Sequence, residues 1–97
     1  MPKKGIPMDQ NNIQLNLKNL DGWIYVESTK SIQKEFTFKS YLKNIGFVNA
    51  VAWVANKLNH HPDLEVSFNK CVVKITTHDE GGISEKDFSL AREIENL

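Results

Sequence analysis

Cysteine is almost absent from this sequence, since Cys71 is the only one among 97 residues. A lone cysteine cannot form an internal disulfide, so the fold depends on its hydrophobic core and suits a reducing compartment. Long hydrophobic runs are absent too: no stretch approaches the ~18 apolar residues of a membrane span, and residues 1–10 lack the apolar segment of a signal peptide. We therefore expect a cytoplasmic protein that does not associate with membranes.

Excess charge of one sign is also lacking, because 12 Lys and Arg side chains balance 12 Asp and Glu side chains. This balance argues against a nucleic-acid binder that relies on phosphate neutralisation. The remaining composition, 40% hydrophobic and 25% charged with three Pro, is typical of a soluble globular domain. We expect residues 1–10, which have little apolar character, to form a flexible tail, and residues 11–97 to form one domain.

The first half of the chain predicts two strands and a long helix. Residues 13–20 fit a short helix or an extended piece equally well, with helix weakly favoured. Residues 23–26 are aromatic and β-branched, as is typical of a strand, and the alternation of Ile32, Phe36 and Phe38 predicts a second strand antiparallel to it. After Ser40 the apolar residues recur in steps of three and four up to Leu58, which predicts the main helix.

The second half predicts a hairpin and a last helix. Placing Asn69 and Lys70 in the turn gives apolar pairs on one face of the hairpin: Phe68 with Cys71, Val66 with Val73, and Leu64 with Ile75. After Gly81 and Gly82, Ser84 and Asp87 match a capping box at the start of a C-terminal helix. The expected fold class is therefore α+β, with a single four-stranded antiparallel sheet and two or three helices packed on one face.

The chemistry is concentrated in three histidines, His60, His61 and His78. Extending the hairpin register pairs His61 with His78 on the helix-free face. Imidazole titrates near neutral pH and both donates and accepts protons, so acid and base catalysis fits these residues better than a zinc site. A nucleophilic triad is poorly supported, because no G-x-S-x-G motif is present and Cys71 lies on the apolar face of the predicted hairpin.

The sequence around these histidines resembles the pterin-4a-carbinolamine dehydratase family. The family pattern, H-H-P followed by an aromatic residue, a histidine and an aspartate, is met by His60-His61-Pro62, Phe68, His78 and Asp87. Similarity extends from about residue 20 to the C-terminus. Two positions depart from the pattern: Asn56 stands where the family has a charged residue and cannot exchange protons near neutral pH, and Leu64 stands where an aromatic is frequent.

This resemblance implies dehydration of 4a-hydroxytetrahydrobiopterin to quinonoid dihydropterin and water, which recycles the pterin cofactor of aromatic amino-acid hydroxylases. We expect His60, His61 and His78 to be catalytic, with no metal or other cofactor and no covalent intermediate. Ser84 and Asp87 are expected to have a structural role as the helix cap. The expected substrate-binding residues are the catalytic histidines together with Pro62, Thr76 and Thr77.

Two alternatives remain open from the sequence. Animal members of the family also act as a dimerisation cofactor of a transcription factor, so a non-catalytic interaction module on the same fold is the second reading. A pterin enzyme of another purpose, such as molybdopterin metabolism, is the third. The resemblance also implies a homodimer or homotetramer, and Trp53, which lies outside the apolar stripes of the main helix, is expected near a helix-mediated contact.

Overall fold

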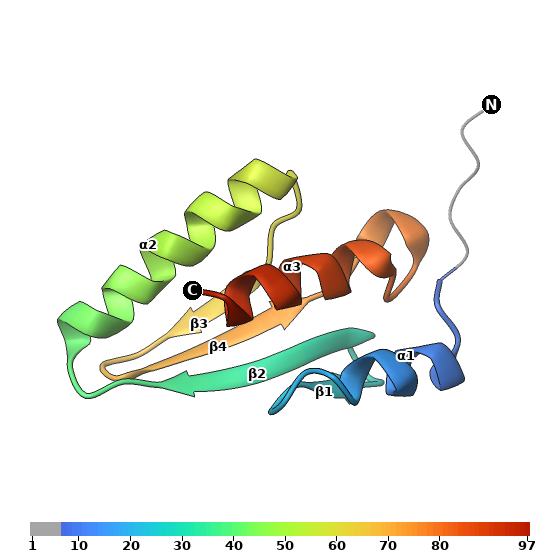
Figure 1. The fold of residues 1–97 in the computed structure, drawn as a ribbon, viewed down its shortest axis with the longest axis horizontal. Helices are drawn as coiled ribbons and strands as arrows, with labels where there is room; N and C mark the ends of the chain where they lie inside the picture. The colour runs from blue at the N-terminus through green and yellow to red at the C-terminus, as the bar shows by residue number, and fades with distance from the viewer. Residues whose placement is uncertain (1–6) are drawn as a thin grey trace.

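The computed structural model describes residues 7–97 and has one four-stranded antiparallel sheet, as expected (Figure 1). The strands are arranged in the order β1-β2-β4-β3, which places β1 and β3 at the two edges. Three α-helices and a short 3-10 helix complete the fold. The bounds are α1 Gln10–Leu17, β1 Ile24–Val26, β2 Ser31–Thr37, α2 Tyr41–Leu58, β3 Asp63–Val66, β4 Lys70–Ile75, η1 His78–Glu80 and α3 Glu85–Glu95.

The core lies between the sheet and the helices. The side chains of β4 that face the helices are fully buried, and so are Ile32 of β2 and the inward residues of α3, whereas Phe36 of β2 is partly buried. In Figure 1, α2 and α3 both lie over the same face of the sheet, and α1 lies beside β1. Within residues 7–97, no helix lies over the opposite face. Five of the fully buried side chains are Ile32, Val73, Ile75, Phe88 and Leu90.

The helix boundaries follow the signals in the sequence. The Ser40 side chain accepts from the backbone N–H of Lys43, which caps α2 at its start, and α2 ends at Leu58. Of residues 13–20, for which the sequence left a helix or an extended piece open, residues 13–17 belong to helix α1, which begins earlier because Asp9 caps it, and residues 18–20 form a turn. Of the flexible tail expected for residues 1–10, residues 1–6 lie outside the described residues. In the described part, the Met8 N–H donates to the Ile83 carbonyl. No helix within residues 7–97 is long and apolar enough to cross a membrane.

The predicted hairpin exists, but its predicted register is wrong by two residues. Val66 pairs with Cys71, and Leu64 pairs with Val73. Because side chains alternate with a period of two, this shift keeps the same residues on the apolar face, and the apolar pattern alone cannot detect it. The turn therefore lies one residue earlier than expected, at Phe68 and Asn69, and Phe68 does not pair with Cys71.

Contacts around the turn explain the observed register. The Phe68 ring is exposed and stacks on the Tyr41 ring, with centroids 6.3 Å apart and planes 6° from parallel. The buried Asn44 donates from Nδ2 to the carbonyl oxygens of Ser67 and Lys70, at 2.7 and 2.9 Å. These bonds attach both ends of the turn to α2, so tertiary contacts determine where the hairpin reverses.

Candidate active site

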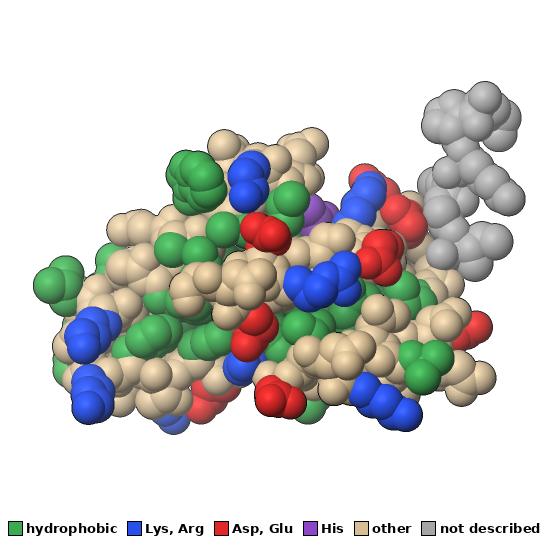
Figure 2. Space-filling model, viewed as in Figure 1, with side chains coloured by type: hydrophobic (Ala, Val, Ile, Leu, Met, Phe, Trp, Pro, Cys, Tyr) green, Lys and Arg blue, Asp and Glu red, His purple; other side chains and the backbone are tan. Residues whose placement is uncertain are grey.

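The three histidines line one pocket, of about 330 Å³, at the end of the sheet where β4 meets η1. Figure 2 shows histidine surface at the bottom of a hollow between the end of α2 and the loop before α3. Small-molecule sites are concave and occupy roughly 300–1,000 Å³. The pocket is lined by Asn59, His60, His61, Thr76, Thr77, His78, Asp79 and Lys86.

The end of α2 positions the first two histidines. Asn59 adopts the left-handed conformation, φ 52° and ψ 40°, which stops the helix and turns the chain back. The His60 backbone N–H then donates to the Ala55 carbonyl at 3.1 Å. Pro62 follows, and the chain continues into β3. The backbone that carries His60 and His61 is therefore held in place at the end of α2.

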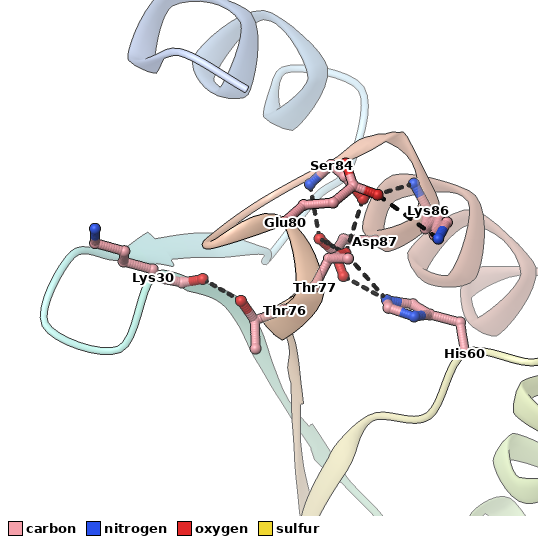
Figure 3. Close-up of polar contacts among 8 residues, drawn as sticks. All are labelled: Lys30, His60, Thr76, Thr77, Glu80, Ser84, Lys86 and Asp87. Carbon is pink, nitrogen blue, oxygen red and sulfur yellow. Dashed lines mark hydrogen bonds and ion pairs between the residues drawn. The ribbon is translucent and has the colours of Figure 1, made fainter. Parts of the chain in front are cut away.

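Asp87 is the buried centre of the polar contacts at this end of the sheet (Figure 3). Its Oδ2 accepts from the Ser84 backbone N–H and from the Thr77 hydroxyl, each at 2.8 Å. The first of these bonds completes the capping box at the start of α3, which confirms the predicted cap. Its Oδ1 lies 2.6 Å from Nε2 of His60, a contact that the sequence did not indicate.

The donor and the acceptor of each hydrogen bond in this cluster can be assigned. An ionised carboxylate only accepts, so the close contact requires Nε2 of His60 to donate to Asp87. Thr77 uses its single hydroxyl hydrogen on Asp87, so the Ser84 hydroxyl, 2.8 Å away, donates to the Thr77 oxygen. Asp87 therefore holds the His60 ring in one orientation and leaves Nδ1 as the only nitrogen of the neutral ring that can accept a proton.

His61 and His78 differ from His60 because both are exposed. Neither forms a side-chain hydrogen bond with another of the residues 7–97. The expected cross-strand pairing of His61 with His78 is not formed: continuing the observed register places His61 opposite Thr76, a consequence of the two-residue shift. Both histidines nevertheless line the same pocket as His60.

Thr76 and Thr77, both expected to bind substrate, already use their hydroxyl hydrogens in hydrogen bonds within the protein. Thr76 donates to the Lys30 carbonyl at 2.6 Å, which ties the end of β4 to the turn between β1 and β2 (Figure 3). Thr77 is buried and donates to Asp87. A ligand in the pocket can therefore use these hydroxyl groups only as acceptors.

Sequence reasoning missed three lining residues, Asn59, Asp79 and Lys86. Lys86 lies in the first turn of α3, and its Nζ is 3.6 Å from the Glu80 carboxylate. Nothing in the local pattern distinguishes these residues from ordinary surface residues. Asn56, which departs from the family pattern, is exposed on α2 and is not among the residues that line the pocket, and Leu64 packs against the core.

Cys71 is fully buried in β4, and its burial raises the pKa of the thiol. A buried thiol with a raised pKa is a poor nucleophile. This position agrees with the expectation that Cys71 takes no part in chemistry. Within residues 7–97, no group of three or more His, Cys, Asp or Glu side chains is arranged to hold a metal ion.

Comparison with known proteins decides the family. The model of the pterin 4 alpha carbinolamine dehydratase family matches residues 6–97. The chain belongs to this family. Its similarity to a relative from Nitrosospira multiformis, provisionally named a pterin-4-alpha-carbinolamine dehydratase, is 48% identity over 94% of this chain and 79% of the relative.

Solved structures agree with this assignment. A transcriptional coactivator/pterin dehydratase from Brucella melitensis superposes with a TM-score of 0.88 at 32% identity, covering 93% of this chain and 96% of that one. A pterin dehydratase-like protein described as a RuBisCO assembly factor in the alpha-carboxysome has a TM-score of 0.66 at 18% identity, over 77% and 87% of the two chains. The second likeness shows the shared fold alone.

Proposed function

We propose that this protein dehydrates 4a-hydroxytetrahydrobiopterin, a pterin-4a-carbinolamine, to quinonoid dihydropterin and water. The observation that carries the proposal is that His60, held from behind by the buried Asp87, lines one pocket together with two further histidines. Membership of the dehydratase family supports the substrate class. The product returns to the tetrahydro form by reduction, so the reaction serves the recycling of the pterin cofactor used by aromatic amino-acid hydroxylases.

The reaction needs two proton transfers and no change in oxidation state. The C4a–O bond breaks as a proton is delivered to the hydroxyl oxygen, and water leaves. The N5–H proton is removed, and the nitrogen electron pair forms the C4a=N5 double bond. One acid and one base therefore suffice, and imidazole performs either role near neutral pH.

The site provides imidazoles in two different environments. His60 is held by a buried carboxylate, which stabilises the imidazolium that forms if Nδ1 accepts a proton. His61 and His78 are exposed and face the same pocket, where their rings are free to exchange protons with substrate and water. We propose that the three histidines share the two proton transfers, with Pro62, Thr76 and Thr77 shaping the binding site.

Four accompanying proposals complete the description. Residues 11–97 act as a single pterin carbinolamine dehydratase-like domain, and the reaction uses no metal or other cofactor because proton transfer alone is required. The protein works in the cytoplasm, as its single cysteine suits a reducing compartment. Its small-molecule partner is the pterin substrate.

Turnover of freshly prepared carbinolamine, followed by ultraviolet absorbance, tests the proposed activity. A catalytic amount of protein is expected to convert many equivalents of substrate faster than buffer alone. The alternative is a non-catalytic interaction module, and the name of the Brucella melitensis protein, a transcriptional coactivator/pterin dehydratase, is the observation in its support. Such a module would not accelerate the reaction. A rate equal to that in buffer would reject the enzyme and retain the module.

We also propose that the protein is a homo-oligomer, a dimer or tetramer, with Trp53 at a helix-mediated contact. The Trp53 side chain is 68% exposed on α2, and Leu42 on the same helix is 81% exposed. Within the chain, the Trp53 ring is contacted by the Lys57 ammonium, 5.3 Å from its centroid. Large exposed aromatic side chains are enriched at the centres of interfaces.

Replacing Trp53 with alanine is expected to shift the protein toward smaller species in sedimentation at micromolar concentration. The loss of a central aromatic anchor typically weakens association by about 2 kcal/mol or more. Leu15→Ala on α1 is the matched control, since Leu15 is also exposed and lies on another helix. A monomeric wild type rejects the oligomer, and unchanged assembly of Trp53→Ala rejects the role of Trp53.

A further inference from the structure

The hydroxyl group of Thr77 has no task in the proposed dehydration, although Thr77 lines the histidine pocket. The residue is only 4% exposed. Its hydroxyl oxygen lies 2.8 Å from Oδ2 of Asp87, 2.8 Å from the Ser84 hydroxyl and 3.5 Å from Nε2 of His60 (Figure 3). The hydroxyl group therefore belongs to the buried polar cluster behind the pocket, and its contacts there indicate what it does.

Most of the hydrogen-bonding capacity of the Thr77 hydroxyl is already used inside the protein. A hydroxyl group has one hydrogen and two lone pairs. The hydrogen goes to Asp87, and the Ser84 hydroxyl donates to one of the lone pairs. The Ser84 oxygen accepts from the Lys86 backbone N–H at 3.3 Å, so the Ser84 hydrogen is available for Thr77. A substrate could reach at most one lone pair of a buried oxygen, which makes this hydroxyl a poor binding group.

The carboxylate of Asp87 needs such a partner to keep its orientation. The terminal torsion of an aspartate side chain is broad, so a single hydrogen bond does not fix the plane of the carboxylate. Here two donors converge on Oδ2: the Ser84 N–H at the start of α3 and the Thr77 hydroxyl at the end of the sheet. Because they come from different elements, together they leave Oδ1 directed at Nε2 of His60, 2.6 Å away.

We propose that Thr77 is a positioning residue, whose hydroxyl group orients the Asp87 carboxylate and, through it, the ring of His60. With Oδ2 held, Nε2 of His60 keeps donating to Oδ1, and Nδ1 stays the nitrogen that accepts a proton. The effect on catalysis rests on the proposed dehydratase function. The orientation of the ring does not, because it is a property of the protein without substrate.

Carbinolamine turnover by Thr77→Val and Thr77→Ser separates positioning from substrate binding. Valine has nearly the shape of threonine but no hydroxyl, so kcat is expected to fall by about tenfold or more, because a misplaced catalytic group loses rate steeply. KM should stay at the wild-type value, since the hydroxyl does not contact the substrate. Serine restores the donor and should restore kcat. A raised KM at unchanged kcat in Thr77→Val, or no recovery of kcat in Thr77→Ser, would overturn the positioning role.

Ser84→Ala is the matched control, because it removes another buried hydroxyl from the same cluster. This variant loses the side-chain cap of α3 but keeps the bond from Thr77 to Asp87. It is expected to lower the melting temperature and to keep kcat near the wild-type value at a temperature where it is fully folded. An equal loss of kcat in Ser84→Ala and Thr77→Val would mean a general disturbance of the cluster and would overturn the role of Thr77.

A second measurement needs no substrate: nuclear magnetic resonance of protein labelled with ¹⁵N in its histidines. The Nε2–H of His60 is held by a buried carboxylate, and the side chain is 14% exposed, so its hydrogen should exchange slowly with water and give a resonance that His60→Gln lacks.

This resonance is expected in the wild type, Thr77→Ser and Ser84→Ala, and is expected to be broadened or lost in Thr77→Val, where the carboxylate is free to turn. An unchanged resonance in Thr77→Val would overturn the positioning role. If the resonance responds as expected but the wild type does not turn over carbinolamine, the dehydratase function fails and the positioning of His60 by Thr77 stands. The two failures are therefore distinguishable.

Discussion

Replacing His61 or His78 with alanine is expected to lower kcat/KM by about 10²-fold or more in each case, because each variant loses an imidazole that exchanges protons with the substrate. Both side chains are exposed and form no side-chain hydrogen bond with residues 7–97, so neither replacement removes a buried contact. The melting temperature should therefore remain close to that of the wild type. The measurement is initial-rate kinetics on freshly prepared carbinolamine.

Asn56→Ala is the matched control for both histidine variants. Asn56 is exposed near the end of α2 and does not line the histidine pocket, although the family pattern has a charged residue at this position. Its replacement is expected to leave kcat/KM near the wild-type value. If His61→Ala and His78→Ala both remain folded and keep full activity, the assignment of proton transfer to these residues is wrong.

Asp87→Asn is expected to lower kcat by about 10²-fold and the free energy of unfolding by about 1–3 kcal/mol. Two donors, the Ser84 N–H and the Thr77 hydroxyl, point at Oδ2, so the amide oxygen of asparagine must take that place. The amide NH₂ then faces Nε2 of His60, which can no longer donate. His60 is forced into the other tautomer, and the nitrogen that accepts a proton changes.

Two measurements separate this positioning role from a purely structural one. Kinetics at a temperature where Asp87→Asn is fully folded should show the loss in kcat with little change in KM, since Asp87 is buried and does not line the pocket. Glu85→Gln, which removes an exposed carboxylate from the same helical turn, should reduce stability slightly and leave kcat unchanged. A destabilised Asp87→Asn with wild-type kcat would leave Asp87 only as a helix cap.

Much of the fold can be predicted from the sequence because caps, helical periodicity and strand alternation depend on interactions between residues close in the chain. The Ser40 cap, the helical period that follows it and the Ser84–Asp87 capping box each involve groups within a few residues of one another. The strand faces follow from alternation for the same reason. The hairpin register could not be obtained in this way, because Asn44 and Tyr41 of a distant helix hold the turn.

The sequence predicted which histidines belong to the candidate site, but it did not predict the hydrogen bond that holds His60. His60, His61 and His78 were found from the chemistry of imidazole and the family pattern, and the pocket contains all three. The bond between His60 and Asp87 joins residues 27 positions apart and depends on how α3 packs over the end of β4. A capping box explains one oxygen of Asp87, and the place of Asp87 in the family pattern was the only signal in the sequence of a further role.

The most direct test of histidine acid and base catalysis compares the wild type with His61→Gln/His78→Gln in carbinolamine turnover. Glutamine keeps hydrogen-bonding capacity at both positions and cannot exchange protons near neutral pH. Histidine catalysis predicts multiple turnovers by the wild type and a rate indistinguishable from buffer for the double variant, at an unchanged melting temperature. A folded double variant that turns over carbinolamine at the wild-type rate would contradict it.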